Sequence, residues 1–385
     1  MQPSPYTPGT VARDVYGRES YLNELRRELL FMSEYPAIQG RIHVYVGPRG
    51  VGKTSLLRAV QSEARALGFD SVWATAGDGP LVPVLLEELR ELSGNWKEHA
   101  RNIFTSAANA ISVTTGGLKV SPQLGEAASK VPSGVGRQLQ KALIAAGQAA
   151  HGAGKGLVIF IDEVQAADPE GIRALAYAWQ HMQSEAKDVP IMAVTAGLSH
   201  AQDVITDAVS FAERFLYQQL HNLEEDDSVA ALRSPAQRAG VRWEDEALNV
   251  ALARTKGYPY FLQVIGDETW KSAGYPKEGE TIRLPHINDA SENFNHIRES
   301  FFRTRWEKAT PGENDFLMAM AALGDGAVAR KDVAARMGKS TTDISMVRAS
   351  LMDKGLIDSP ERGQLEFTAP GFADYVRRVS GMDDE

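Results

Sequence analysis

The sequence predicts an α/β protein in which a parallel sheet covered by helices is followed by a helical lid and a C-terminal winged helix. Three observations predict this order. Two short apolar strands, 42–46 and 157–161, each end in polar residues, and a glycine-rich loop joins the first to an amphipathic helix. Residues 223–289 contain amphipathic helices, and residues 311–385 follow a pattern of three helices and two short strands. At 385 residues, the chain is long enough for two or three domains.

The composition is that of an ordinary globular protein, with 43% apolar and 24% charged residues. The net charge of −9 argues against a protein that coats nucleic acid over its whole surface, so any such contact has to be local. No apolar run is long enough to span a membrane. Residues 1–12 lack the pattern of a secretory signal and are predicted to form a flexible tail. The absence of cysteine excludes disulfides and fits a cytoplasmic protein.

The strand 42–46 leads into a G-x-x-x-x-G-K-[ST] phosphate-binding loop, and an amphipathic helix follows. The glycines let consecutive backbone N–H groups point at an anion, and the helix adds the positive end of its dipole. We expect Lys53 to reach the β- and γ-phosphates of a nucleotide, and the hydroxyl of Thr54 to hold Mg²⁺. The residues predicted to bind the nucleotide here are Gly47, Pro48, Arg49, Gly50, Val51, Gly52, Lys53, Thr54 and Ser55.

The second apolar strand, 157–161, is followed by Asp162 and Glu163. Five consecutive apolar residues fit a central parallel strand that is covered on both faces. Ligands of open α/β sheets lie outside the carboxyl ends of the strands, so both carboxylates are expected to face the same crevice as Lys53. We expect Asp162 to hold Mg²⁺ through water and Glu163 to polarise the water that attacks ATP.

The remaining elements of the core, predicted over 13–222, follow from periodicity. Further strands are expected at 70–76 and 190–198, and helices at 81–92 and 169–186. Residues 94–155 form an insertion with helices at 95–109 and 138–151 and, between them, a hairpin over 111–120 around its Gly-Gly pair. The insertion either packs on the edge of the sheet or contacts DNA or a partner protein.

The C-terminal third continues with a connecting helix over 290–310 and a winged helix over 311–385. Its recognition helix is expected at 342–354 and its wing at 356–368. The side chains that could reach a DNA groove or its phosphates are Lys339, Ser340, Thr341, Thr342, Ser345, Arg348 and Arg362. However, residues 311–385 contain nine Lys and Arg against thirteen Asp and Glu, a balance of −4, whereas modules that read DNA usually carry a basic stripe. Winged helices also contact proteins, so both partners stay open.

Together these motifs resemble the P-loop ATPases of the AAA+ and STAND type, in the initiator-like branch that includes origin-recognition proteins. The similarity extends from about Val15 to Arg378. It implies ATP and Mg²⁺ as ligands, hydrolysis that resets the protein, and self-association of ATP-bound subunits. No counterpart is found for the sensor-2 arginine of many AAA+ lids.

The resemblance also assigns roles to single residues. Tyr16, Gly17 and Arg18 match the hydrophobic-Gly-Arg segment that lies against the adenine in these families. Pro259 matches the proline that begins a lid helix beside the base. Thr195 takes the sensor-1 position, and Arg214 that of the arginine finger, which acts on the nucleotide of a neighbouring subunit. The alternative for Arg214 is a surface arginine paired with an acid such as Glu213.

The sequence therefore predicts a Mg²⁺-dependent ATPase whose nucleotide state controls assembly and DNA binding through the winged helix. A nucleotide-gated signalling or defence switch that acts through protein partners and oligomerisation is the alternative. A third hypothesis keeps ATP as a structural ligand without turnover, and the intact Asp162-Glu163 pair argues against it.

Overall fold

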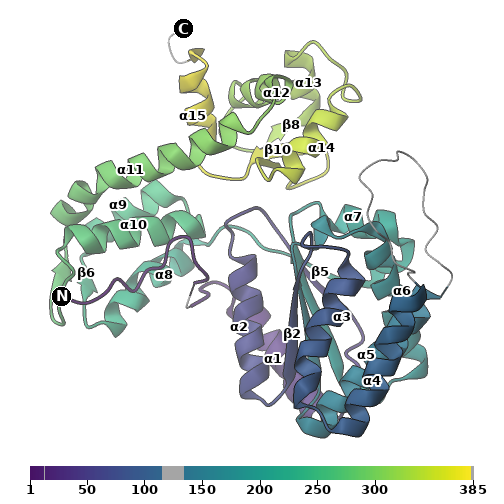
Figure 1. Cartoon of the computed structure of the whole chain (residues 1–385). Coiled ribbons are helices and arrows are strands. Elements are labelled where there is room, and N and C mark those ends of the chain that lie inside the picture. The colour runs from purple at the N-terminus through teal and green to yellow at the C-terminus, as the bar shows by residue number, and fades with distance from the viewer. Residues whose placement is uncertain (13, 115–133, 383–385) are drawn as a thin grey trace.

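The computed structural model describes residues 1–12, 14–114 and 134–382 (Figure 1). Its core is a sheet of five parallel strands in the order β2-β3-β4-β1-β5. The strands are β1 (His43–Val46), β2 (Asp70–Thr75), β3 (Leu157–Asp162), β4 (Ile191–Gly197) and β5 (Leu216–Gln219). Since β1 lies between β4 and β5, the loop that follows it opens near the middle of the sheet. The predicted parallel sheet is confirmed.

The two faces of the sheet are buried against separate sets of helices. On β3, Leu157, Ile159 and Ile161 belong to the apolar cluster on one face, while Val158 and Phe160 belong to the cluster on the other. One face packs against α1 (Glu19–Glu34) and α2 (Lys53–Ala66). The other packs against α3 (Leu81–Leu92), α4 (Glu98–Thr114), α5 (Val135–Ala153), α6 (Pro169–Glu185) and α7 (Ala201–Ala208). Three short 3₁₀ turns complete the core: η1 (Ser93–Asn95), η2 (Val164–Ala166) and η3 (Ser210–Arg214).

The described helices of the insertion at 94–155, α4 and α5, pack on the body of the core. Helix α5 contacts α4, α6 and the interior strand β3, and its side chains join the same apolar cluster as those of α3. The strand predicted to start at Ile111 is wrong, because 111–114 are the last residues of α4. Alternating apolar residues over so short a stretch fit either element, and here the buried Ile111 continues the apolar face of the helix. The rest of the predicted hairpin lies outside the described residues.

The lid consists of α8 (Glu225–Arg238), α9 (Asp245–Thr255) and α10 (Pro259–Ser272), with a two-stranded parallel ribbon of β6 (Arg242–Trp243) and β7 (Thr281–Ile282). The long helix α11 (Leu284–Glu307) runs from the lid to the C-terminal domain (Figure 1). Phe294 and Phe302 of α11 are buried in an apolar cluster shared by the lid and the C-terminal domain. No described helix is both long and apolar enough to cross a membrane.

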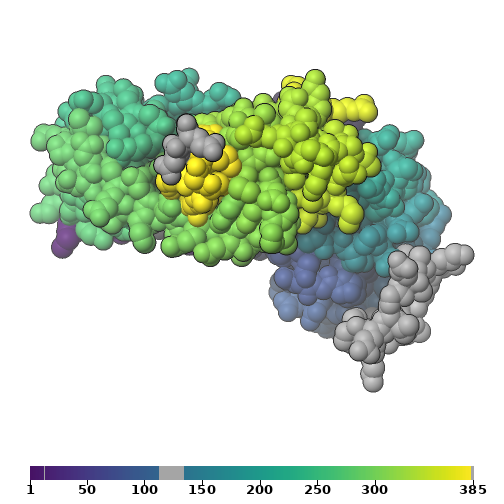
Figure 2. All heavy atoms as spheres, turned by 90° about the horizontal axis from the view of Figure 1, so that it is seen from above, coloured from purple at the N-terminus to yellow at the C-terminus, as the bar shows by residue number. Residues whose placement is uncertain are grey.

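The C-terminal domain consists of short helices and a small sheet. Its helices are α12 (Pro311–Ala321), α13 (Arg330–Arg336), α14 (Ser345–Asp353) and α15 (Phe372–Val379). Its strands, β8 (Val328–Ala329), β9 (Ile357–Asp358) and β10 (Gln364–Phe367), form an antiparallel sheet in the order β8-β10-β9. Seen from above, this domain lies between the lid and the core and covers part of the core (Figure 2).

Residues 1–12 are not the flexible tail that the sequence predicts, because they pack along the lid. The Tyr6 side chain is 3% exposed, its hydroxyl donates to the carbonyl of Leu232, and the indole of Trp243 donates to that hydroxyl at 2.9 Å. The indole of Trp270 donates to the carbonyl of Gln2 at 3.0 Å. The segment contains prolines and polar residues, and its single aromatic ring supplies the apolar contact that anchors it.

Replacing Tyr6 by alanine is expected to destabilise the lid by about 3 kcal/mol, because a large buried ring and two hydrogen bonds are lost. Urea unfolding followed by tryptophan fluorescence measures the change, since Trp243 and Trp270 both contact this segment. Val11→Ala is the matched control, because Val11 is exposed in the same segment. If both variants unfold at the same urea concentration, the packing of residues 1–12 on the lid is refuted.

Candidate active site

The phosphate-binding loop has the backbone that its glycines allow. Gly50 and Gly52 have φ angles of 81° and 95°, a region that residues with a side chain rarely adopt. Helix α2 starts at Lys53, directly after the loop. The Lys53 side chain is 6% exposed, and its Nζ donates to the carbonyls of Gly47 and Pro48 at 2.9 and 2.8 Å. The loop therefore folds around a buried ammonium group at the N-terminus of a helix, an arrangement suited to phosphates.

Thr54 and Asp162 meet at the end of β3. The Thr54 hydroxyl donates to Asp162 Oδ2 at 2.7 Å, and the backbone N–H of Glu163 donates to Oδ1 at 3.0 Å. Burial raises the pKa of the Asp162 carboxyl, and the hydrogen bond from Thr54 acts against this shift. A hydroxyl and a carboxylate oxygen side by side are hard ligands of the kind that Mg²⁺ prefers, with water and phosphate oxygens completing its shell. The residues present thus fit the metal that the loop implies.

Glu163 lies next to the same site in an uncommon conformation. Its φ and ψ of 54° and 39° are left-handed, which few residues other than glycine adopt. Its carboxylate Oε2 accepts from the side chain of Gln165 at 2.6 Å. Because a strained residue persists only where its surroundings hold it, this backbone marks Glu163 as a functional candidate.

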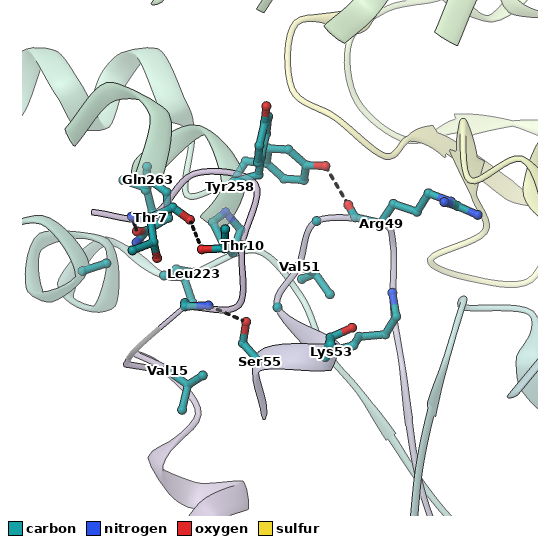
Figure 3. Close-up of a pocket in the computed structure, with 18 of the residues that line it drawn as sticks. Thr7, Thr10, Val15, Arg49, Val51, Lys53, Ser55, Leu223, Tyr258 and Gln263 are labelled. Atoms are coloured by element: carbon teal, nitrogen blue, oxygen red, sulfur yellow. Dashed lines mark hydrogen bonds between the residues drawn. The ribbon is translucent and has the colours of Figure 1, made fainter. Parts of the chain in front are cut away.

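Beside the loop lies a cavity of about 400 Å³, between the phosphate loop, the N-terminal segment and the lid (Figure 3). Thr7, Thr10 and Val15 border it from the N-terminal segment, and Leu223 and Gln263 border it from the lid side. The backbone N–H of Ala12 donates to the Ser55 hydroxyl at 3.2 Å, which ties the segment to α2. The size is within the range of small-ligand sites. Tyr16, Ser55 and Pro259 line the cavity, as expected for residues beside a nucleotide.

Gly17 and Arg18 make contacts within the protein that shape the site. The buried guanidinium of Arg18 donates to the carbonyls of Val51 and His221, and so joins the phosphate loop to the chain after β5. Burial lowers the pKa of Arg18. Gly17 has a φ of 66°, and a Cβ there would stand 2.6 Å from the Asp227 carboxylate. This pair fixes the walls of the cavity, although Arg18 also lines it.

Thr195 does not reach the site. Its side chain is 2% exposed, and its hydroxyl donates to the carbonyl of His43 at 3.1 Å inside the sheet. Because successive side chains of a strand point to opposite faces, the position of Thr195 on β4 directs it into the interior, where apolar side chains surround it. The sensor-1 role assigned to it is therefore not supported by this geometry.

Arg214 is exposed and precedes β5, at the amino ends of the parallel strands. The phosphate loop follows the carboxyl end of β1, which pairs with β5 in register from His43 to Val46. The structure therefore does not bring Arg214 to the phosphate site of its own chain.

Several residues of the site were not among those predicted from the sequence. The Tyr258 hydroxyl donates to the carbonyl of Arg49 at 2.6 Å, so the lid contacts the tip of the phosphate loop (Figure 3). Arg305 of α11 lines the cavity with its guanidinium 3.4 Å from the ring centroid of Phe301. No sequence motif marks Arg305. Tyr258 directly precedes Pro259, and that Tyr-Pro pair could have indicated the role of Tyr258.

Asp168 is a further positioning residue. Its carboxylate accepts from the backbone N–H of Gly171 and from that of Leu81, both at 2.7 Å, and so caps α6 and binds the start of α3. Asp followed by Pro169 is a helix-start signal that could have identified this role.

Residues 14–194 match the family of AAA ATPase domains, and residues 299–376 match a domain of unknown function (DUF8462). No curated protein sequence matches the chain significantly. The phosphate loop and the β2-β3-β4-β1-β5 sheet lie within or directly beside the part of the chain that is similar to AAA ATPase domains.

Solved structures resemble the chain over nearly its whole length. The Walker-type ATPase PABY2304 of Pyrococcus abyssi is 17% identical with a TM-score of 0.59, and the match covers 96% of this chain and 98% of that protein. The ORC2 protein of Aeropyrum pernix, in its ADPNP-ADP complexes, is 14% identical with a TM-score of 0.57, covering 98% of both chains. Cdc6p from Pyrobaculum aerophilum is 12% identical with a TM-score of 0.50, and the match covers 97% of this chain and 96% of that protein. The chain thus shares its overall fold with these three proteins.

The binding of ATP is expected to take up protons at alkaline pH. Burial lowers the pKa of Lys53 to about 8, against the opposing effect of the Glu163 and Asp162 carboxylates. Negatively charged phosphate oxygens favour the protonated ammonium, so the pKa of Lys53 is higher in the ATP complex than in the free protein. The affinity for ATP therefore falls as pH rises above about 8. Calorimetry in buffers of different ionisation enthalpy should show uptake of about half a proton or more per ATP at pH ~8.5.

The same titration at pH ~6.5 should show no uptake assigned to Lys53, because the ammonium is already charged there. Lys97→Met, which removes an exposed lysine of the core, is the matched control and should keep the full uptake. Equal proton uptake at both pH values would contradict the lowered pKa of Lys53.

Proposed function

We propose that the protein hydrolyses ATP with Mg²⁺ at the phosphate loop, and that its nucleotide state sets the position of the C-terminal domain. Through that domain it controls assembly and the binding of duplex DNA. The observation that carries this proposal is the meeting of Lys53, Thr54, Asp162 and Glu163 at one end of the sheet. The C-terminal domain rests on the same end, because the Ser199 hydroxyl donates to a carboxylate of β9 at 2.6 Å.

The residues divide the chemistry between them. Lys53 and the loop N–H groups hold the phosphates in line and balance the charge that develops on them. Glu163 accepts a proton from the attacking water, whose oxygen bonds to the γ-phosphorus while the bond from phosphorus to the β–γ bridging oxygen breaks. The proton then passes to the products, ADP and phosphate. Thr54 and Asp162 would hold Mg²⁺, which supplies further charge neutralisation when bound.

Self-association follows from the position of Arg214. Its guanidinium is exposed on the surface of the core, and no hydrogen bond or ion pair of it is found among the described residues. It cannot serve its own phosphate site, so we propose that it completes the site of a neighbouring subunit as an arginine finger. A ring or filament of subunits would supply that neighbour. Adenine is proposed to occupy the cavity between Tyr16 and Pro259.

The C-terminal domain is proposed to be a winged helix that contacts DNA. Helix α14 takes the place of the recognition helix, and Lys339, Ser340 and Thr342 are exposed in the turn before it. Arg348 of α14 is half-buried and close enough to Asp203 of α7 for their charges to interact. The docked domain therefore turns part of α14 toward the core, so full access of α14 to a DNA groove requires the domain to move. A nucleotide-dependent movement of this kind would make DNA binding respond to ATP.

A second candidate function is a signalling or defence switch that acts through protein partners. The observation that favours it is the balance of −4 over residues 311–385, which works against the attraction of DNA phosphates. In that case the same movement of the C-terminal domain would expose a protein-binding surface instead.

Glu163→Gln is expected to lower kcat for ATP by about 10²- to 10⁴-fold with ATP binding retained, because the amide cannot take a proton from water. Phosphate release and equilibrium nucleotide binding measure the two effects. Lys53→Ala should abolish nucleotide binding. Unchanged turnover in Glu163→Gln would remove Glu163 from the mechanism, and intact binding in Lys53→Ala would refute the phosphate site.

Duplex DNA should bind in one nucleotide state more tightly than in the others. Binding of the wild type is measured with ATP, with ADP and without nucleotide across a salt series, and affinity should fall as salt rises. Replacing both Lys339 and Arg362 by alanine should weaken binding and reduce its salt dependence. The absence of salt-dependent binding in every state would exclude DNA and leave the protein-partner function.

A further inference from the structure

The carboxamide of Gln165 connects the Glu163 carboxylate to the segment that follows β4. Its Nε2 donates to Glu163 Oε2 at 2.6 Å, and its Oε1 accepts from the backbone N–H of Leu198 at 2.9 Å. These two bonds fix the orientation of the amide, because a backbone N–H can only donate and an ionised carboxylate can only accept. Gln165 therefore fixes the position of Glu163 Oε2. The other oxygen of that carboxylate, Glu163 Oε1, is left to accept from another donor.

Gly197, at the end of β4, leaves room for the side chain of Gln165. A Cβ on Gly197 would stand 2.7 Å from Gln165 Oε1 and 2.9 Å from the side chain of Val164. Both separations are shorter than atoms in contact allow, and the Cβ of Ala201 would also stand 2.7 Å away, so a side chain at the end of β4 would crowd Gln165 together with its neighbours. This close approach is independent of the hydrogen bonds and points to the same contact.

The segment that holds Gln165 is in turn held by the C-terminal domain. The Ser199 hydroxyl donates to Asp358 Oδ2 at 2.6 Å, and His200 Nε2 lies 2.9 Å from Asp353 Oδ1. Asp358 is 4% exposed, and its other oxygen accepts from the backbone N–H of Ser359 at 2.7 Å. Leu198, Ser199 and His200 are consecutive, so contacts of the C-terminal domain act directly on the residue that binds Gln165.

We propose that Gln165 is a positioning residue for Glu163, and that the docked C-terminal domain keeps it in place through Ser199. The inference rests on the proposed function of Glu163. When the domain is docked, the Leu198 N–H is held where Gln165 can bind it, and the carboxylate is oriented toward the attacking water. When the domain moves away, the segment after β4 is released and the orientation of Glu163 is lost. Hydrolysis is thereby coupled to the position of the C-terminal domain.

Gln165→Met tests the first part, because methionine has a similar shape and cannot donate or accept as the amide does. We expect kcat for ATP to fall about 10- to 100-fold while KM and equilibrium ATP affinity stay within about twofold, since only the orientation of Glu163 changes. Gln165→Asn keeps the amide but is too short to bridge both partners, so it should show the same loss. Gln202→Met, at an exposed glutamine of α7, is the matched control and should behave as the wild type.

Two double variants separate positioning from a general structural effect. In the Glu163→Gln background, Gln165→Met should have no further effect on the residual rate. Ser199→Ala should lower kcat by about 3- to 10-fold alone and not at all in the Gln165→Met background, because both act through the same contact. A normal kcat in both Gln165 variants, or a Ser199→Ala effect that persists without Gln165, would overturn the proposal.

The outcomes distinguish this inference from the proposed function. If Glu163→Gln retains full turnover, the role of Glu163 fails, and the inference fails with it. If Glu163→Gln abolishes turnover and the two Gln165 variants do not change kcat, the proposed function stands and only the role of Gln165 is refuted. A fall in kcat with unchanged KM in the Gln165 variants supports the inference.

Discussion

The buried ammonium of Lys53 is the charge around which the rest of the structure is arranged. Removing such a group from water is costly unless opposite charges and hydrogen-bond acceptors surround it. The loop supplies two carbonyls, β3 supplies Asp162 and Glu163, and Asp358 of the C-terminal domain adds a further negative charge. Even so, burial lowers its pKa, so the group is not fully compensated without a ligand. The triphosphate of ATP supplies the missing negative charge, which favours the binding of ATP beside Lys53.

Three parts of the chain that are distant in sequence contact the phosphate loop or the helix that follows it. The N-terminal segment binds α2 through Ser55, the lid binds the loop through Tyr258, and the C-terminal domain packs Gly355 against the side chain of Arg49. A ligand that enters the loop therefore changes the surroundings of all three at once. The C-terminal domain, which does not belong to the ATPase core, is thus in direct contact with the phosphate loop.

The sequence predicts the parts of this site that depend on local pattern, and misses those that depend on the tertiary fold. Glycine spacing and apolar runs were enough for the phosphate loop, β1 and β3, because backbone geometry and strand burial set these residues directly. The sequence does not determine the direction of the Thr195 side chain, because a central strand is apolar on both faces and its pattern does not tell which face a polar residue takes. Tyr6 and the contact between Ser199 and Asp358 could not be foreseen, since each joins residues far apart in the sequence.

Two polar contacts between the core and the C-terminal domain differ in strength. The His200–Asp353 pair contributes at most about 1 kcal/mol, because the Asp353 side chain is 68% exposed and water screens it. The hydrogen bond from Ser199 to the buried carboxylate of Asp358 is stronger, about 1.5–3 kcal/mol for a charged acceptor. In a two-state equilibrium with a free-energy difference of a few kcal/mol, the minor state is populated at about 0.1–10%, and a ligand that prefers that state can reverse the balance. Because Gln165 joins this segment to Glu163, a contact that holds the C-terminal domain also bears on the orientation of the carboxylate.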